Sequence, residues 1–222
     1  MTDFSPNSNL DDARKLRAFA LAAAGILLLT SLGLLAETVL QHKVFYESDI
    51  LCKDELHQHA LTHDGLRDFF LRFTDLAGRP ALLVYTVAVL IALLFARHRR
   101  LSAIWLAVTF GGFKLIELLK DYYARQRPEF LEPIVKELSP SMPSAHTAGA
   151  TLVFGMLAYL LIRFTRRAGW YLAPLLGVVI VGIGFSRLYL GAHWLSDVVC
   201  GWLLGSGCVA LAMAAAESSR ER

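Results

Sequence analysis

The sequence AFALAAAGILLLTSLGLLA, which runs from Ala18 to Ala36, contains no charged side chain. A helix needs about 20 predominantly apolar residues to cross the hydrocarbon core of a bilayer. Comparable apolar blocks follow along the chain at residues 80–96, 101–119, 147–162, 170–186 and 198–216. We therefore expect an all-α protein whose fold is a bundle of six transmembrane helices.

The composition supports this interpretation. Of the 222 residues, 55% are hydrophobic and 18% are charged, whereas soluble domains are about half apolar and about a quarter charged. No polar segment is long enough to fold alone, so we expect one integral-membrane domain over residues 1–222. The first block could instead be a cleaved signal peptide. Its apolar stretch is longer than the usual about 7–15 residues and no small-residue cleavage site follows at Glu37, so we favour an uncleaved helix.

Basic residues mark the side of the membrane on which each connection lies. They cluster in residues 1–17, in the second connection and in the fourth: Arg14, Lys15, Arg17, Arg97, Arg99, Arg100, Arg163, Arg166 and Arg167. Such clusters face the cytoplasm, so residues 1–17 form a cytoplasmic tail in this interpretation and the C-terminus, with Arg220 and Arg222, returns to the same side. The first, third and fifth connections then face outward. The net charge of +3 gives no indication of nucleic-acid binding.

Residues 41–79 form the long first connection on the outer face. Apolar residues recur there at helical spacing among charged ones, which predicts an amphipathic interfacial segment. Two interpretations remain open: a flap that contacts lipid, or a cover over the outer end of the bundle. Four histidines fall here, and we expect them to be solvated: His42, His57, His59 and His63. Because no third ligand accompanies His59 and His63, we predict no metal site.

The first of three polar motifs is Lys120-x6-Arg127-Pro128. Residues seven apart on a helix share a face, and Pro128 places Arg127 near the helix end, so the two cations are predicted to flank one anion. Arg125 would point elsewhere on this helix and meet solvent or lipid headgroups. Six and three residues before Lys120, Lys114 and Glu117 are expected to form a pair inside the bundle, or Glu117 orients Lys120.

The second motif, Pro143-Ser144-Ala145-His146, immediately precedes an apolar block. Ser144 is suited to cap a helix whose first backbone N–H groups have no helical partners. A helix N-terminus of this kind attracts anions. His146 would lie in the first turn beside the anion. Simple helix capping with a surface histidine explains this motif equally well.

The third motif is Ser186-Arg187-x5-His193-x3-Asp197. Gly191 permits a tight connection, after which His193 is predicted to open a helix with Asp197 one turn further on. A carboxylate there can accept a hydrogen bond from one imidazole nitrogen and leave the other nitrogen free as a nucleophile. Ionisable groups at this depth in a membrane protein are costly and are commonly functional. A charge pair at an interface is the simpler alternative.

The ordered set of motifs resembles the type 2 phosphatidic acid phosphatase (PAP2) superfamily, whose pattern is K-x6-R-P, P-S-G-H and S-R-x5-H-x3-D. The first and third motifs match completely, and the second has Ala145 where glycine is usual. The matched motifs span residues 120–197, and the six-helix layout extends the resemblance over nearly the whole chain. Ala145 keeps its backbone N–H but forbids dihedral angles that only glycine adopts.

The resemblance implies a metal-independent lipid phosphatase, without a cofactor, that works through a phosphohistidine intermediate. His193 would be the nucleophile, Asp197 its partner, and His146 the general acid and then the general base. Phosphate would bind to the remaining motif residues: Lys120, Arg127, Ser144, Ala145 and Arg187. Because the two histidines must start in opposite protonation states, we expect a bell-shaped dependence of activity on pH.

The expected substrates are phosphate monoesters or diphosphates of lipids, such as undecaprenyl diphosphate, phosphatidylglycerol phosphate or phosphatidic acid. The compact chain resembles bacterial members, which implies the inner (cytoplasmic) membrane with an extracytoplasmic active site. Two alternatives remain: a phosphotransferase that passes the phosphoryl group to a lipid acceptor, and a carrier that binds lipid without catalysis. Cys52, Cys200 and Cys208 show neither a disulfide framework nor metal-ligand spacing.

Overall fold

The computed structural model describes residues 6–39, 45–165 and 167–218. These residues form eight α-helices and one 3-10 turn, with no strand among them. The element order is α1 Pro6–Val39, α2 Tyr46–Thr62, α3 Asp64–Thr74, η1 Asp75–Ala77, α4 Arg79–Phe95, α5 Arg99–Tyr123, α6 Ala145–Thr165, α7 Arg167–Tyr189 and α8 Leu195–Glu217. The predicted all-α fold is confirmed.

Five helices of the described chain, namely α1, α5, α6, α7 and α8, are long and apolar enough to cross a membrane. The remaining predicted span, residues 80–96, corresponds to α4. This helix is long and apolar enough to cross a membrane only when it is joined to Asp64–Ala77 across a bend of 42°. Apolar side chains on the outer surface of the bundle remain exposed, among them Phe19, Leu83, Ile91, Phe110, Leu175 and Val178. In a bilayer these side chains contact lipid.

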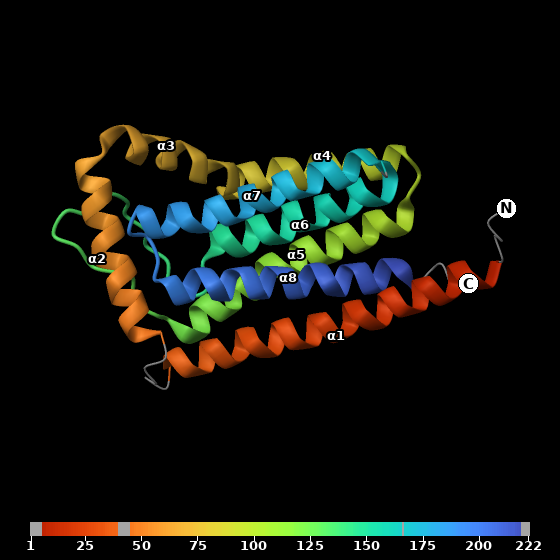
Figure 1. The fold of residues 1–222 in the computed structure, drawn as a ribbon, viewed down its shortest axis with the longest axis horizontal. Coiled ribbons are helices and arrows are strands. Elements are labelled where there is room, and N and C mark those ends of the chain that lie inside the picture. The colour runs from red at the N-terminus through yellow and green to blue at the C-terminus, as the bar shows by residue number, and fades with distance from the viewer. Residues whose placement is uncertain (1–5, 40–44, 166, 219–222) are drawn as a thin grey trace.

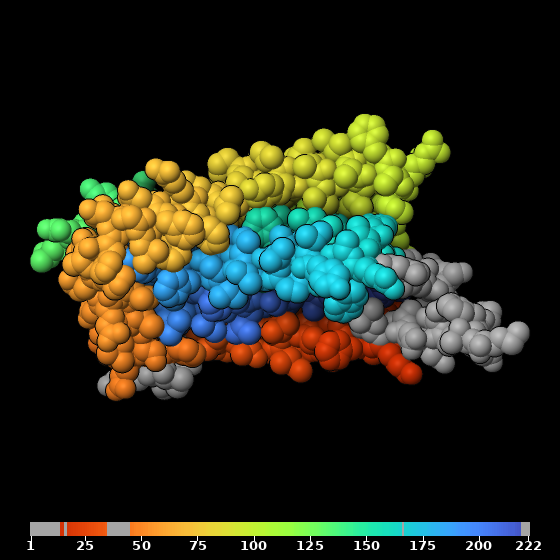
Figure 2. Space-filling view, turned by 45° about the horizontal axis from the view of Figure 1, so that its top comes forward, coloured from red at the N-terminus to blue at the C-terminus, as the bar shows by residue number. Residues whose placement is uncertain are grey.

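The long helices run side by side, and α2 crosses one end of the bundle while α3 returns along its edge (Figure 1). This arrangement matches the second interpretation of residues 41–79, a cover over one end of the bundle. The space-filling view shows α2 and α3 spread over that end (Figure 2). The connection between α5 and α6 lies at the same end, as does the turn between α7 and α8 (Figure 1). All three polar motifs are therefore gathered at the α2 end.

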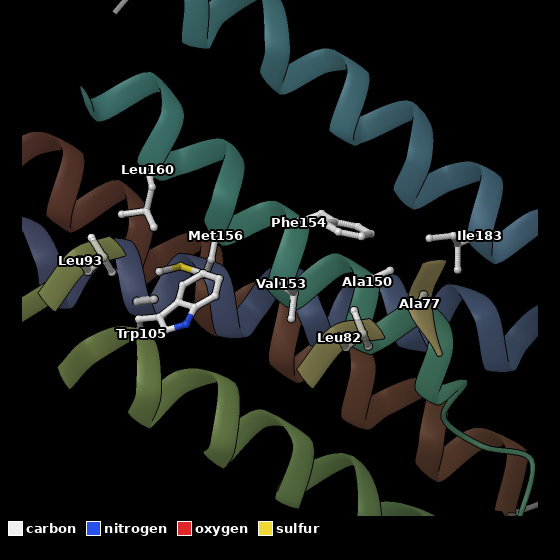
Figure 3. Close-up of a cluster of buried hydrophobic side chains, with 11 residues drawn as sticks. Ala77, Leu82, Leu93, Trp105, Ala150, Val153, Phe154, Met156, Leu160 and Ile183 are labelled. Atoms are coloured by element: carbon white, nitrogen blue, oxygen red, sulfur yellow. The ribbon is translucent and has the colours of Figure 1, made fainter. Parts of the chain in front are cut away.

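The buried core lies between α4, α5, α6, α7 and α8, with Trp105, Val153 and Met156 near its centre (Figure 3). The Trp105 indole N–H donates to the carbonyl of Thr86 at 2.9 Å, which satisfies the polar atom of this buried ring.

Two glycines of α8 bring that helix against α6. A Cβ atom added to Gly205 would lie 2.6 Å from the Cβ of Thr151, and one added to Gly201 would lie 3.1 Å from the carbonyl oxygen of Ser144. Small residues four apart allow close helix approach in membranes, where lipid removes the hydrophobic drive for helix association. This contact joins the N-terminal half of α6 to the N-terminal half of α8.

The end of α5 differs from our expectation. The helix stops at Tyr123, and Ala124 adopts a left-handed conformation with φ 44°. Pro128 disfavours helix only at the residue before it, but the chain has already left the helix three residues earlier. Arg125 and Arg127 are therefore loop residues, and they do not share a helical face with Lys120.

Candidate active site

A cavity of about 540 Å³ lies at the α2 end of the bundle. One part of its wall is polar, with Lys120, Arg127, Glu137, His146 and His193. Another part is apolar, with Leu82 and Leu83 from α4 and Phe113 and Ile116 from α5. The cavity thus places a charged cluster next to a surface that suits a hydrocarbon chain.

His193 lies at the polar wall, and its side chain is 2% exposed. Its Nδ1 is 3.3 Å from the Oδ2 of Asp197, and its Nε2 is 3.2 Å from an Nη1 of Arg127. Burial lowers the pKa of this imidazole well below its ordinary value, although the hydrogen bond to Asp197 opposes the shift. The neutral ring therefore donates its Nδ1 proton to Asp197 and keeps a lone pair on Nε2.

The predicted position of His193 on the helix was wrong in detail. The helix α8 begins at Leu195, and His193 stands just before it in the turn that contains Gly191, whose φ is 68°. Asp197 lies in the first turn, where its Oδ2 also accepts the backbone N–H of Trp194 at 2.9 Å. This capping contact fixes the carboxylate with respect to the turn that carries His193.

Both cations of the first motif, Lys120 and Arg127, are held by carbonyl oxygens. Lys120 Nζ donates to the carbonyls of Pro140 and Ser141. Arg127 donates from Nε to the carbonyl of Ser139 at 2.8 Å and from Nη1 to that of Ala192 at 2.7 Å. Although Arg127 is not helical, it lines the same cavity as Lys120. The two cations therefore line one cavity, as predicted, but Arg127 reaches it from the loop and not from the helix.

Arg187 is buried at the end of α7. Its Nη2 donates to Oε1 of Glu137 at 2.5 Å and its Nη1 lies 3.3 Å from the hydroxyl of Thr74. Its buried Nε has no hydrogen-bond partner among the described residues. An unsatisfied guanidinium N–H is costly unless a ligand accepts from it.

Glu137 was not predicted as a site residue. Its carboxylate pairs with Arg187 and lies 4.0 Å from an Nη2 of Arg127. Burial would raise the pKa of this carboxyl, but the charges of Arg187 and Arg127 outweigh burial and hold the pKa below its ordinary value. The anionic oxygens therefore occupy part of the positive cluster. Glu137 lies in an irregular, proline-rich loop, where no periodicity marks it.

The second motif begins α6. Ser144 is fully buried, and its hydroxyl accepts from the hydroxyl of Thr147 at 2.9 Å, while its backbone N–H donates to the carbonyl of Asp197 at 3.1 Å. Ala145 and His146 line the cavity. In the described backbone, positive φ angles occur only at Arg97, Ala124 and Gly191. Ala145 is therefore compatible with its position without strain.

Arg125 contradicts our expectation that it meets solvent or headgroups. Its Nη1 lies 2.5 Å from Oδ1 of Asp197, and its Nη2 lies 2.9 Å from Oδ2 of Asp49 on α2. Ser141, another residue outside the prediction, donates its hydroxyl to Asp197. Sequence spacing gives no signal for these contacts, because Asp49 and Arg125 are far apart in the chain.

Other polar residues also depart from expectation. His57 is buried rather than solvated; it stacks on Phe130 at 3.6 Å between ring centroids, and burial lowers its pKa. Lys114 and Glu117 do pair, at 2.9 Å, but on an exposed face rather than inside the bundle.

The remaining histidine and cysteine predictions concern possible metal or disulfide sites. The rings of His59 and His63 stack at 3.8 Å, and no group of three potential metal ligands occurs in the described part of the chain. His42 lies outside the described residues. Cys52, Cys200 and Cys208 are free thiols.

This chain is similar to known proteins in both sequence and fold. Phosphatidylglycerophosphatase B of Bacillus subtilis (strain 168) is 32% identical over 58% of this chain and 64% of its own length. The undecaprenyl-diphosphatase of Sulfolobus acidocaldarius is 32% identical over 68% of this chain and 69% of its own length. The match therefore spans about two thirds of each of these relatives.

A solved structure is similar over most of the chain. The crystal structure of the transmembrane PAP2 type phosphatidylglycerolphosphate phosphatase from Bacillus subtilis has a TM-score of 0.74 at 28% identity, with 85% of this chain and 93% of that chain covered. The chain is thus an integral membrane protein by both its apolar helices and its structural likeness. The model of the PAP2 superfamily matches residues 101–221, which include all three motifs, and the chain belongs to this superfamily.

Proposed function

We propose that this protein is a membrane lipid phosphatase that removes the terminal phosphoryl group of a lipid phosphate or diphosphate. One observation carries the proposal: His193 Nε2 lies 3.2 Å from Arg127 at the wall of a cavity that also contains Lys120 and His146. Behind the ring, Asp197 accepts from Nδ1. A nucleophile with an orienting partner beside a cluster of positive charge is what phosphoryl transfer requires.

The reaction proceeds in two steps. Nε2 of His193 attacks phosphorus, the bond from phosphorus to the leaving oxygen breaks, and His146 gives that oxygen a proton. Asp197 stabilises the cationic phosphoimidazole through the Nδ1 proton. Water then attacks phosphorus and passes its proton to His146, the nitrogen–phosphorus bond breaks, and His193 returns to its neutral form. The products are the dephosphorylated lipid and inorganic phosphate.

Fixed cations neutralise the charge that develops on the equatorial oxygens. Lys120 and Arg127 line the cavity, and Arg187 carries an Nε that has no partner among the described residues. The backbone N–H groups at the start of α6, near Ala145, face an anion with the positive end of the helix dipole. In this mechanism the three side-chain cations take the role that a metal ion has in other phosphoryl-transfer enzymes.

The apolar wall supports a lipid rather than a soluble phosphate. Leu83 is 62% exposed on the membrane-facing side of α4 and lines the cavity as well. A lipid tail can therefore remain in the bilayer while the headgroup reaches His193. We favour polyprenyl diphosphate or glycerophospholipid phosphate, because one relative is named an undecaprenyl-diphosphatase and the other a phosphatidylglycerophosphatase. By the placement of basic residues, the site faces outward from the bacterial cytoplasmic membrane, with both termini in the cytoplasm.

The test is a panel of lipid phosphates presented in detergent to wild type, His193→Ala and His146→Ala, with His63→Ala as a matched control on the exposed surface. We expect release of inorganic phosphate from at least one lipid, a loss of about 10³-fold or more in His193→Ala, and a normal rate in the control. Substrate with a labelled phosphoryl group should label the wild-type protein, but not His193→Ala, after a quench in alkaline denaturant, in which a phosphohistidine is stable. Activity in His193→Ala equal to wild type would overturn the proposal.

Two further outcomes separate the alternatives. Label that appears on a second lipid instead of free phosphate would identify a phosphotransferase. Lipid that moves between the leaflets of vesicles without any release of phosphate would identify a carrier.

A separate test concerns metal dependence. If a chelator abolishes turnover and only added metal restores it, the metal-independent mechanism is excluded.

A further inference from the structure

The helix α2 reaches the catalytic carboxylate through two charged residues. Arg125 donates from Nη1 to Oδ1 of Asp197 at 2.5 Å and from Nη2 to Oδ2 of Asp49 at 2.9 Å. Asp49 lies in the first turn of α2 and is 4% exposed. One guanidinium group thus bridges a residue of the covering helix and the partner of His193.

The same two residues also hold the start of α8. Asp49 Oδ1 accepts the backbone N–H of Ser196 at 2.8 Å, and its Oδ2 accepts the hydroxyl of Ser196 at 2.7 Å. Arg125 Nη1 donates to that hydroxyl as well, at 2.8 Å. Ser196 immediately precedes Asp197, so the backbone and the side chain of the catalytic segment are both fixed from α2.

The charge balance explains why both partners are needed. Asp197 is fully buried and Asp49 nearly so, and a buried carboxylate is costly unless it is paired and fully hydrogen-bonded. Arg125 supplies the positive charge that both carboxylates share, and its planar fork fixes their relative orientation. Without Arg125, Oδ1 of Asp197 would lose its donor and two buried carboxylates would lack their cation.

The backbone around Arg125 directs its side chain toward Asp49 and Asp197. The left-handed Ala124 turns the chain away from the axis of α5, and the carbonyl of Arg125 accepts the N–H of Ser141 at 2.8 Å. The guanidinium lies 5.6 Å from the ring of Trp194. The side chain is therefore held on several sides rather than being free to reorient.

We propose that Arg125, and Asp49 acting through it, are positioning residues that hold Asp197 in register with His193, so that α2 is part of the catalytic apparatus. This inference rests on the proposed function, in which His193 is the nucleophile. As the ring of His193 becomes positive, Asp197 must be ionised with Oδ2 directed at Nδ1. Arg125 occupies Oδ1 and leaves Oδ2 for that contact.

The experiment measures kcat and KM for Arg125→Gln, Arg125→Lys and Asp49→Asn in the full-length protein in detergent. We expect kcat to fall about 10- to 100-fold in Arg125→Gln with KM changed less than about threefold, since loss of residues that orient a reactive group has effects of this size. Lysine, a point charge without a fork, should restore part of the rate. In Asp49→Asn we expect a smaller loss of kcat, because Arg125 and the Ser196 donors lose one carboxylate oxygen.

Coupling between the residues gives a second readout. Because Asp49 and Arg125 contact each other and both hold the segment of Ser196 and Asp197, the loss of rate in the double variant should be smaller than the product of the two single losses. Matched controls are Arg67→Gln on α3 and Asp54→Asn on α2, both of which lie outside the site and should keep the wild-type rate. The melting temperature of each variant in detergent shows whether it is folded.

The outcomes separate this inference from the proposed function. If His193→Ala is inactive while folded Arg125→Gln keeps the wild-type kcat, the positioning role is wrong and the phosphatase assignment stands. If His193→Ala is active, the proposed function fails first. Should Arg125→Gln not fold, the values of kcat for Arg125→Lys and Asp49→Asn decide whether the positioning role holds. An equal loss of kcat in the controls would also overturn the proposal.

Discussion

Glu137 and Arg187 form an ion pair at the cavity, with 2.5 Å between Oε1 and Nη2. The carboxylate of Glu137 therefore binds Arg187, a cation that binds the phosphate of the substrate in the proposed function. An anion that enters the site must either displace Glu137 or share the guanidinium with it. Because the neighbouring arginines hold the pKa of Glu137 below its ordinary value, the competing charge is present at every pH near neutrality.

We predict that Glu137→Gln binds inorganic phosphate more tightly than wild type does. The variant removes the competing negative charge and keeps the shape of the side chain, so the inhibition constant for phosphate should fall about three- to tenfold. The measurement is inhibition of lipid hydrolysis by added phosphate at pH 7. Glu129→Gln, an exposed position in the same loop, is the control. An inhibition constant that rises in Glu137→Gln would contradict the competition.

The dependence of kcat/KM on pH should be bell-shaped, with its acid limb below pH about 6.5. Burial lowers the pKa of His193 in the folded protein, so the neutral ring persists to lower pH than an exposed histidine would allow. As pH falls through that lowered pKa, the ring becomes protonated and loses its lone pair. An acid limb centred above the ordinary histidine value would mean that the nucleophile titrates in a more solvated environment than the structure describes.

Protonation of His193 also affects stability in a defined direction. The unfolded chain takes up this proton near pH 6.5, while the folded chain resists it, so the contribution of the neutral ring to stability is complete above that pH and declines as pH falls. We predict that the melting temperature of the wild type decreases between pH 7 and pH 5 more than that of His193→Gln. Thermal unfolding in detergent at a series of pH values provides the comparison. Equal slopes for the two proteins would count against the buried neutral ring.

The contact between α6 and α8 should tolerate little added volume. A methyl group on Gly205 would lie 2.6 Å from the Cβ of Thr151 and 2.8 Å from the carbonyl oxygen of Ala148. Gly205→Ala should therefore cost about 1–3 kcal/mol of stability and push the N-terminal halves of the two helices apart. We expect a lower melting temperature together with a lower kcat. Gly177→Ala is the matched control, because nothing lies within 4 Å of the added atom there; equal effects at both positions would contradict the close approach.

Restoration of the usual glycine in the second motif should change little. Ala145 is helical, with no positive φ, so the motif does not require the conformational freedom of glycine at this position. We predict that Ala145→Gly keeps kcat within about twofold of wild type and slightly lowers stability, since glycine in a helix costs about 0.5–1 kcal/mol relative to alanine. Steady-state kinetics and thermal unfolding measure both. A large gain in kcat would show that the alanine methyl restricts the pocket.

The features of this protein that depend on local sequence could be predicted, and those that depend on tertiary contacts could not. Apolar blocks located the membrane-spanning helices, and the spacing of His193 and Asp197 correctly predicted their contact. The end of α5 was misplaced because the left-handed turn at Ala124 has no glycine or proline to mark it. Asp49 escaped notice because one carboxylate on a polar helix looks like any solvated charge until α2 is placed against α8.

The exposed flank of the cavity, where Leu83 is 62% exposed on α4, has a kinetic consequence. A substrate that reaches the site along this flank stays in the bilayer or micelle and does not enter the aqueous phase. Its effective concentration is therefore its mole fraction among the lipids or detergent around the protein. Initial velocity in mixed micelles should then fall when inert amphiphile is added at constant total substrate. We therefore expect the rate to saturate with the surface concentration of substrate rather than with its bulk molarity.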